Sequence, residues 1–323
     1  MAIPPLVVQT ARCGWHWQWQ QLMGGLGPAD AEGNYQRPVS DHLNGEIPEQ
    51  SDLQARKAKD LPLLIVGRSC PWAHRTWLVH RLRQLASQLT LLMASPDHQG
   101  GRWVLAPAWE ECNSLLDVYR HCGAPPSHRA TVPVLVDPTR PAILCNDSAP
   151  LVELLNQWPS TETELDLDPP ALHGQIETWQ TLLQPAVNDG VYRCGFARTQ
   201  TAFHRAETAL FDALKNVEIN LQESGPWLCG DQLTLADVRL FPTLIRWETV
   251  YAPLFGCNKQ PLWQFPELWN WRRRFFQIPG VQETCDATVW RQDYFGALFP
   301  LNPGGIVPTA PELSRLVMSE IPR

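Results

Sequence analysis

A single cysteine, Cys70, stands in the segment RSCPWAHRT (residues 68–76), directly after the apolar run LPLLIVG (61–67). The apolar run has the length and composition of a buried strand, and residues 72–88 carry apolar side chains on an approximate helical stripe. The thiol is therefore expected at the N-terminus of a helix, where unpaired backbone N–H groups and the helix dipole favour an anion.

The neighbours Arg68, His74 and Arg75 are expected to add positive charge around this thiol. Such surroundings lower the pKa of a cysteine, which predicts that Cys70 ionises below a free thiol and is alkylated quickly at mildly acidic pH. The simpler alternative is that Cys70 is a packing residue, as small buried cysteines commonly are.

Three kinds of thiol chemistry compete for this position. A dithiol oxidoreductase needs a second cysteine at C-x-x-C, and Ala73 occupies that place. A Cys–His hydrolase or a zinc site would recruit His74, but no acyl-transfer machinery or second ligand pair accompanies it, so no metal is expected. The remaining chemistry is monothiol exchange, in which an external thiol, usually glutathione, resolves a mixed disulfide.

Composition limits the functional classes. The 323 residues are enough for two domains, and a net charge of −7 gives no support to nucleic-acid binding. The sequence has no membrane-length apolar run and no signal-peptide pattern at its start, so a cytoplasmic protein without membrane contact is expected. The nine cysteines form no regular framework, and the eight besides Cys70 are expected to be small buried hydrophobes in a reducing compartment.

The strand and helix signals divide the chain. Residues 61–158 read as a thioredoxin-like α/β domain, with further strands at 89–94, 130–137 and 141–147, a loop containing GGRWVLAP (100–107) and a closing helix at 148–156. Pro133 cannot donate a ladder hydrogen bond, so its strand should be an edge strand or irregular there, and the Val132–Pro133 bond should be cis as in thioredoxin-like folds.

The second half reads as helical. TQTAFHRAETALFDALKNVEINLQES (199–224) has apolar residues at helical spacing, and TLADVRLF begins with Thr234 and Asp237 in a capping-box arrangement. The expected organisation is an irregular extension at 1–60, the thioredoxin-like domain at 61–158, an all-helical domain at 159–285 and a C-terminal tail at 286–323 packing near an acceptor pocket.

This organisation and these motifs resemble the cysteine-type glutathione transferases, above all the Xi class, the glutathionyl-hydroquinone reductases, which are related to the omega class. The resemblance covers roughly residues 61–311. The matching segments are SCPWAHRT (69–76), ATVPVLVD (130–137), NDGVYRCGFA (188–197), LTLADVRLFPTLIRWE (233–248), CNK (257–259), FPELWNW (265–271) and NPGGIVP (302–308).

The resemblance implies that Cys70 forms a mixed disulfide with glutathione, the co-substrate. It also implies that Trp103 lies against the tripeptide and that Arg129 pairs with a glutathione carboxylate. Val132, before Pro133, would offer its backbone to the cysteinyl residue.

The γ-glutamyl end would bind at the next strand-to-helix turn. The family has Glu-Ser there, and this chain has Asp147-Ser148. The carboxylate of Asp147 would hold the amine, and Ser148, as N-cap, would help bind the carboxylate. Both residues also suit simple helix capping.

The resemblance further implies an acceptor pocket with Tyr192, in GVYRCGFA, and Tyr294 as candidate proton donors. The tail segment DYFGAL (293–298) departs from the family's HYYGSH, with Asp293, Phe295 and Leu298 in place of histidine, tyrosine and histidine.

The implied function is a glutathione-dependent reductase of glutathionyl-hydroquinones, with glutathione and glutathionylated aromatic molecules as partners and a homodimer as the assembly. Two alternatives remain open. One is omega-like activity, meaning dehydroascorbate reduction or deglutathionylation. The other is a non-catalytic ligand carrier, which the altered tail motif favours.

Overall fold

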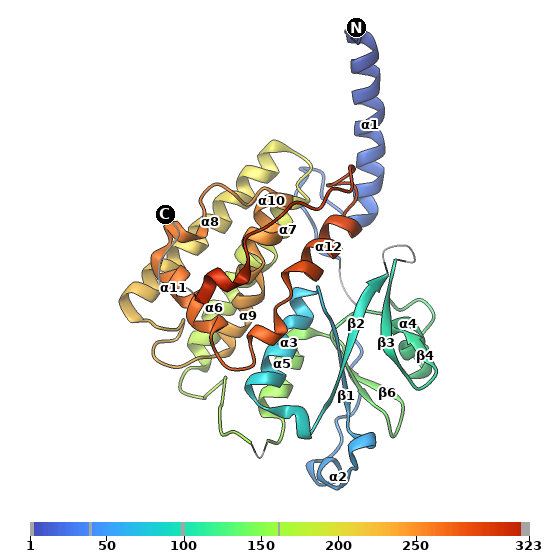
Figure 1. Cartoon of the computed structure of the whole chain (residues 1–323), viewed down its shortest axis with the longest axis vertical. Coiled ribbons are helices and arrows are strands. Elements are labelled where there is room, and N and C mark those ends of the chain that lie inside the picture. Colours follow the sequence, from blue (N-terminus) through green and yellow to red (C-terminus); the bar gives the residue numbers. More distant parts are fainter. Residues whose placement is uncertain (1–2, 39–40, 98–100, 161, 318–323) are drawn as a thin grey trace.

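The structure is a computed structural model that describes residues 3–38, 41–97, 101–160 and 162–317. A sheet with its helices lies beside a group of longer helices, and one helix projects away from both (Figure 1). The expected succession of an α/β domain and a helical domain is therefore confirmed. Residues 318–323 of the expected tail lie outside the described residues.

The sheet has six strands in the order β4-β3-β2-β1-β5-β6. β1 and β2 are parallel and are joined through helix α3 (Pro71–Leu82), while the other pairs are antiparallel. The strands are β1 (Leu63–Gly67), β2 (Thr90–Asp97), β3 (Arg102–Trp109), β4 (Cys112–Ser114), β5 (Val134–Asp137) and β6 (Ala142–Cys145).

The strand after Pro133 is an interior strand. β5 begins one residue after the proline and lies between β1 and β6, with Leu63 opposite Val136. Of the two expected outcomes, an edge strand or an irregularity at the proline, the second is found, because Pro133 and its missing N–H lie just before the ladder begins. The Val132–Pro133 peptide bond is cis.

The segment expected to be a loop, 100–107, belongs from residue 102 onward to strand β3, and its residue 100 lies outside the described residues. β2 continues past the predicted end at residue 94, and its last residues pair antiparallel with β3, with Ala94 opposite Leu105 and Asp97 opposite Arg102. The prediction failed because this pair lies toward one side of the sheet and is only partly buried, so the hydrophobic pattern is weak.

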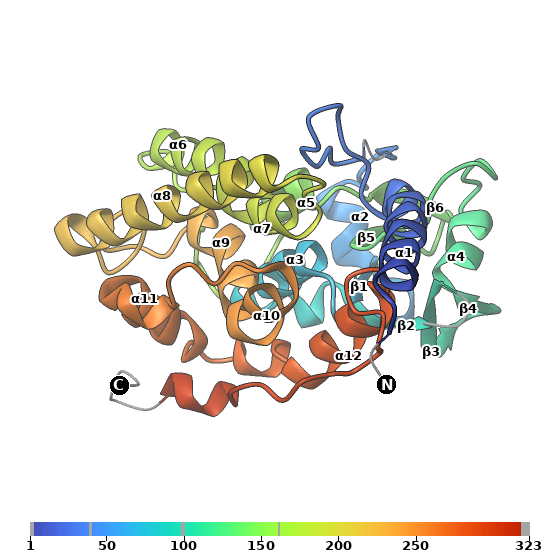
Figure 2. The same ribbon diagram turned by 90° about the horizontal axis from the view of Figure 1, so that it is seen from above.

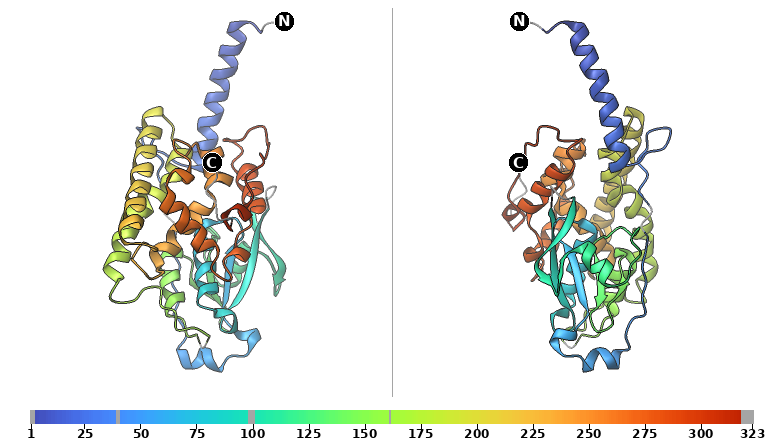
Figure 3. Two further views of the ribbon diagram at one scale, coloured as in Figure 1. Left: turned by 60° about the vertical axis from the view of Figure 1, so that its left-hand side comes forward. Right: turned by 90° about the vertical axis from the view of Figure 1, so that its right-hand side faces the viewer.

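The extension at 1–60 is not irregular throughout. Pro5–Leu26 forms helix α1, which projects away from the rest of the protein (Figures 1 and 3). Gln50–Ala55 forms the short helix α2. α1 shows no helical period because it buries little except Met23 near its C-terminal end. No helix in the described part of the chain, α1 included, combines the length and apolarity needed to cross a membrane.

The second half of the chain forms helices that stand beside the sheet domain (Figure 2). The expected capping box is present, because Thr234 and Asp237 bond each other's backbone N–H groups at the start of α9. α8 begins after its N-cap Thr199. The helices are α6 (His173–Leu183), α7 (Gly190–Gly195), α8 (Gln200–Ser224), α9 (Leu235–Ile245), α10 (Ala252–Phe255), α11 (Pro266–Phe276) and α12 (Ala287–Ala297), with α4 (Leu115–His121) and α5 (Ser148–Gln157) in the sheet domain.

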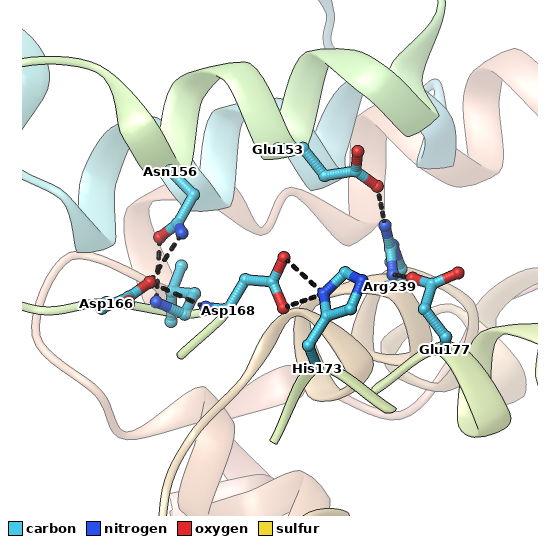
Figure 4. A network of polar contacts seen from close by, with 8 residues as sticks. Glu153, Asn156, Asp166, Asp168, His173, Glu177 and Arg239 are labelled. Carbon is cyan, nitrogen blue, oxygen red and sulfur yellow. Dashed lines mark hydrogen bonds and ion pairs between the residues drawn. The ribbon is translucent and has the colours of Figure 1, made fainter. Parts of the chain in front are cut away.

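The two domains are joined by polar contacts at α5 (Figure 4). Arg239 of α9 is buried and its Nη2 lies 2.5 Å from Glu153 Oε1 on α5, while Nη1 lies 3.4 Å from Glu177 Oε1 on α6. Nearby, Asn156 of α5 bonds Asp166 in the linker at 2.8 Å. These contacts fix α5 against the helical domain.

Candidate active site

Cys70 is the N-cap residue of α3, at the end of β1, as the sequence predicts. The Ala73 N–H points to its Sγ at 3.5 Å, and the Sγ lies 3.8 Å from the carbonyl oxygen of Val132, beside the cis bond. The thiol is half-buried. The strand-to-helix turn and the residue before Pro133 thus both lie next to the Cys70 sulfur.

The predicted low pKa of Cys70 is not found in this structure. Burial raises the pKa of the thiol, and it outweighs the backbone N–H groups of Ala73 and Trp72 and the charges of Arg246 and Arg37, which lower it. The sequence shows a helix N-terminus, which favours the thiolate, but it does not show how much protein surrounds the sulfur.

The positive neighbours also differ from those expected. Arg68 is exposed and points to Asp286, 3.8 Å away. His74 is buried, and burial followed by the charge of Arg246 holds its pKa well below the usual value, so the imidazole is neutral. Burial lowers the pKa of Arg75 to about 9.

A cleft of about 370 Å³ opens beside α3 and the start of α5. Trp72, Asp147 and Ser148 line it, together with Arg37 from the N-terminal extension. Arg37 stacks over the Trp72 ring at 4.0 Å and reaches Asp189 at 2.6 Å. The extension therefore covers part of the predicted glutathione site.

Asp147 is the N-cap of α5, and Ser148 is the first helical residue, so the expectation that Ser148 caps the helix was wrong. The Asp147 carboxylate accepts from the Ala149 N–H at 3.1 Å and lies 3.6 Å from His42 Nε2. Ser148 is buried beside it. Both residues line the cleft, and the helix cap lies one position earlier than predicted.

Trp103 belongs to β3, and its ring lies against Gly67, the last residue of β1 before the cysteine turn. A Cβ added to Gly67 would stand 2.8 Å from the Trp103 ring and 2.6 Å from Val132 Cγ2. Only a glycine therefore permits these two side chains to meet there. None of Trp103, Val132 and Arg129 lines the cleft described above, and the side chain of Arg129 is exposed.

Three tyrosine hydroxyls form a chain in the helical domain. Tyr192 Oη lies 2.5 Å from Tyr294 Oη, which lies 3.3 Å from Tyr251 Oη. The Tyr192 ring stacks on Trp72, with centroids 6.2 Å apart. Burial raises the pKa of all three phenols above the ordinary value, so each keeps its proton at neutral pH.

The second glycine of the GVYRCGFA motif is required for close packing. A Cβ on Gly195 would lie 2.4 Å from Phe255 Cγ, so glycine lets Phe255 approach α7. The Phe255 ring in turn packs against Tyr192 and Tyr294, at centroid distances of 5.4 and 6.1 Å. The motif thus positions the tyrosine pair.

The tail helix α12 lies against the cysteine turn. Asp293 accepts a hydrogen bond from the Ser69 hydroxyl, and Trp290 Nε1 donates to the Arg68 carbonyl at 3.2 Å. Phe295 is buried. The DYFGAL segment therefore supplies Tyr294 to the phenol chain and Asp293 to the residue preceding Cys70.

Three residues of the site were not predicted: Arg37, Tyr251 and Arg246. Arg37 belongs to the extension, which carries no motif. Tyr251 and Arg246 bound a π-helical turn (Trp247–Tyr251) after α9, and their contacts with the site are long-range. The sequence TLIRWE matches the family pattern, but it does not show where Arg246 lies in the folded protein.

The other cysteines do not all follow the prediction. All nine are free, and Cys13 is exposed on α1, so the expectation of eight buried packing residues was wrong for it. Cys122 and Cys285 are half-buried. Among the described residues, no cluster of three or more His, Cys, Asp or Glu side chains is arranged to hold a metal ion.

Comparison with known proteins agrees with this geometry. The glutathione S-transferase N-terminal domain family matches residues 69–158, and the C-terminal domain family matches residues 197–274. The first contains the cysteine turn and the start of α5, and the second contains α8 and α9.

Several relatives match most of the chain. The glutathionyl-hydroquinone reductase YqjG of Escherichia coli (strain K12) is 32% identical over 78% of this chain and 80% of its own length. The glutathione S-transferase omega-like 2 of Schizosaccharomyces pombe is 32% identical over 87% and 94%.

Solved structures give the same result. The glutathione-bound structure of Escherichia coli YqjG has a TM-score of 0.72 at 31% identity, covering 78% of this chain and 85% of that one. The glutathione S-transferase Xi of Phanerochaete chrysosporium has a TM-score of 0.78 at 30% identity, covering 88% and 94%. The chain belongs to the glutathione transferase family, among the Xi-class enzymes that include the glutathionyl-hydroquinone reductases.

Proposed function

We propose that the protein reduces glutathionyl-hydroquinones to hydroquinones with glutathione, using Cys70 as the nucleophile. The observation that carries this proposal is the placement of one thiol, without a resolving cysteine at position 73, beside a chain of protonated phenols. Trp72 links the two, because it follows Cys70 in α3 and stacks on Tyr192.

The chemistry has two steps. The Cys70 thiolate attacks the sulfur of the glutathionyl group, the bond from that sulfur to the aromatic carbon breaks, and the carbon takes its electron pair and one proton. A second glutathione thiolate then attacks the Cys70–glutathione disulfide, which releases oxidised glutathione and the Cys70 thiolate. Two glutathione sulfurs lose two electrons, and the aromatic carbon gains them.

The phenol chain supplies the proton. Tyr192 and Tyr294 share a short hydrogen bond, and Tyr251 bonds Tyr294 from the other side. A phenol that loses its proton here is left with a hydroxyl neighbour that donates to it, which stabilises the phenolate. Tyr192 or Tyr294 is the proposed donor.

Glutathione is proposed to bind along the cleft beside α3. Asp147 and Ser148 would hold the γ-glutamyl end at the start of α5, and the Val132 backbone would bond the cysteinyl residue. Trp103 and Arg129 are proposed contacts for the remainder of the tripeptide. The glutathione-bound structure of the Escherichia coli relative supports glutathione binding by similarity.

One experiment separates the open functions. Purified protein is mixed with glutathionyl-menadiol and glutathione, and formation of oxidised glutathione is followed. Turnover supports the reductase, whereas reduction of dehydroascorbate or a glutathionylated peptide without turnover of the menadiol conjugate supports the omega-like activity suggested by the Schizosaccharomyces pombe relative. Glutathione binding without any turnover would indicate a ligand carrier.

Two further proposals concern the assembly and its place in the cell. We propose that the protein is a homodimer, which light scattering of the purified chain would test. We also propose a cytoplasmic location, which fractionation of the cells that produce the protein would test.

A further inference from the structure

Arg246 is fully buried and is the C-cap residue of α9. Its Nη1 donates to the Pro242 carbonyl at 2.9 Å and to His74 Nδ1 at 2.8 Å. Its guanidinium carbon stands 4.0 Å from the centre of the Trp290 ring. The side chain thus touches α3, α9 and α12 at once.

The charge of Arg246 is not neutralised within the described part of the chain. None of the described carboxylates forms an ion pair with it, and its Nε and Nη2 have no hydrogen-bond partner there. A buried cation without a counter-ion is costly, and natural proteins rarely keep one without a use for it.

Arg272 shows what a structural arginine looks like in the same domain. It is also buried, and its guanidinium lies 4.2 Å from the centre of the Trp269 ring. Its Nη1 and Nη2, however, bond the Glu248 carboxylate at 2.7 and 3.1 Å. The two arginines therefore differ in the counter-ion. Arg75 is another buried arginine without an ion pair among the described residues, but its guanidinium bonds the Arg239 carbonyl and Gln184 Oε1.

His74 does not supply a counter-ion. Because Arg246 can only donate, His74 Nδ1 accepts, and Nε2 carries the hydrogen that is donated to Thr284 Oγ1 at 2.8 Å. The Thr284 hydroxyl in turn donates a hydrogen bond to the Val281 carbonyl at 2.6 Å. This chain orients Arg246 and leaves its charge intact.

The groups that feel this charge are those that lose protons in the proposed reaction. Burial raises the pKa values of Cys70, Tyr251, Tyr294 and the nearby Cys285, and the charge of Arg246 opposes this rise in each of them. In the resting protein these groups are uncharged thiols and phenols, so the cation has no anion beside it. An anion appears only when Cys70 ionises or when a phenol gives up its proton.

We propose that Arg246 is the stored counter-charge of the site, a positioning residue that stabilises the Cys70 thiolate and the phenolate formed when the tyrosine chain donates its proton. This inference rests on the proposed function for the phenolate, but the thiolate part can be tested without any substrate. The other charged or ionisable groups near Cys70 are Arg37 from the extension, Arg75 of α3, Tyr251 of the π-helical turn, and Asp293 and Tyr294 of α12.

The test is the pH dependence of Cys70 alkylation by iodoacetamide, read by peptide mapping in a Cys13→Ala background because Cys13 is exposed. Arg246→Gln removes the charge and is expected to raise the pH midpoint by about one to two units. Arg246→Lys keeps the charge and should stay near the parent. Arg272→Gln is the matched control and should leave the midpoint unchanged, although it lowers thermal stability.

Kinetics gives a second readout if the parent protein turns over glutathionyl-menadiol. Arg246→Gln should lower kcat by about tenfold or more while the KM for glutathione changes little, since Arg246 does not line the cleft. A parent protein without turnover would reject the proposed function, and the alkylation midpoint would still decide the role of Arg246.

A salt titration of the parent keeps the proposal testable even if Arg246→Gln does not fold. A buried charge is little screened, whereas an exposed one loses its effect at about 1 M salt. The midpoint should therefore stay constant between low and high salt. A midpoint that rises with salt would assign the effect to the partly exposed Arg37 and would overturn the proposal. An Arg246→Gln variant that has the parent's midpoint would overturn it as well.

Discussion

The hydroxyl oxygens of Tyr192 and Tyr294 lie 2.5 Å apart although 102 residues separate the two tyrosines in the chain. Tyr192 belongs to α7 in the helical domain, and Tyr294 belongs to α12, which rests on the cysteine turn. The pair therefore exists only when the C-terminal part of the chain has folded back onto both domains. This dependence makes the tail a part of the proposed active site.

Removing one of the paired hydroxyls should slow the reduction of a glutathionyl-hydroquinone. We expect Tyr192→Phe and Tyr294→Phe each to lower kcat by about 10- to 100-fold, and the double variant by up to about 10⁴-fold, since a positioned acid contributes about 10²–10⁴-fold. Steady-state kinetics with glutathionyl-menadiol measures this. Tyr251 bonds Tyr294 at 3.3 Å, and Tyr251→Phe should lower kcat less than either of these variants. A decrease in kcat as large as that of the double variant would contradict the assignment.

Activity should rise from neutral toward alkaline pH. The reacting form of Cys70 is the thiolate, and burial raises the pKa of this thiol, so the fraction of thiolate increases as pH rises toward that pKa. The phenols keep their protons over the same range because their pKa values are raised above 10. A pH profile of kcat/KM checks this, and a profile that falls between pH 7 and 8 would show that another group controls the rate.

The fold could be predicted where the sequence carries a strong local pattern. The buried residues of β1, the helical spacing in α8 and the capping box of Thr234 and Asp237 each follow from neighbouring residues. α1 and β3 could not be found this way. α1 packs only near its C-terminal end, and β3 depends on a partner strand rather than on its own pattern.

The site shows the same division. The place of Cys70 follows from a strand-to-helix junction, and the motif resemblance located Tyr192, Tyr294 and Asp147. The pKa direction of Cys70 could not be read from the sequence, because burial depends on the packing of distant segments. Arg246 was missed for a related reason, since its importance lies in the absence of a carboxylate among its spatial neighbours.

Asp147 allows the helix cap to be separated from glutathione binding. Asn is as good an N-cap as Asp, so Asp147→Asn should preserve stability while it removes the charge proposed to hold the γ-glutamyl amine. We expect the KM for glutathione to rise by about tenfold with a smaller change in kcat. Asp147→Ala should show the same KM and also lose about 1 kcal/mol of unfolding free energy, measured by denaturant titration. An unchanged KM in both variants would place the γ-glutamyl end elsewhere.

The last prediction concerns the loss of the nucleophile. Cys70→Ser should abolish the reductase reaction, because a serine hydroxyl is not ionised at neutral pH and forms no counterpart of the mixed disulfide. The residues proposed to hold glutathione are unchanged in this variant, so glutathione should still bind, as calorimetry would show. A hydroxyl at this helix N-terminus can donate a hydrogen bond to a bound glutathione thiolate, so weak conjugation of glutathione to a small aromatic electrophile is expected to appear. Both reactions should be measured on one preparation, since substantial reductase turnover by Cys70→Ser would mean that Cys70 is not the nucleophile.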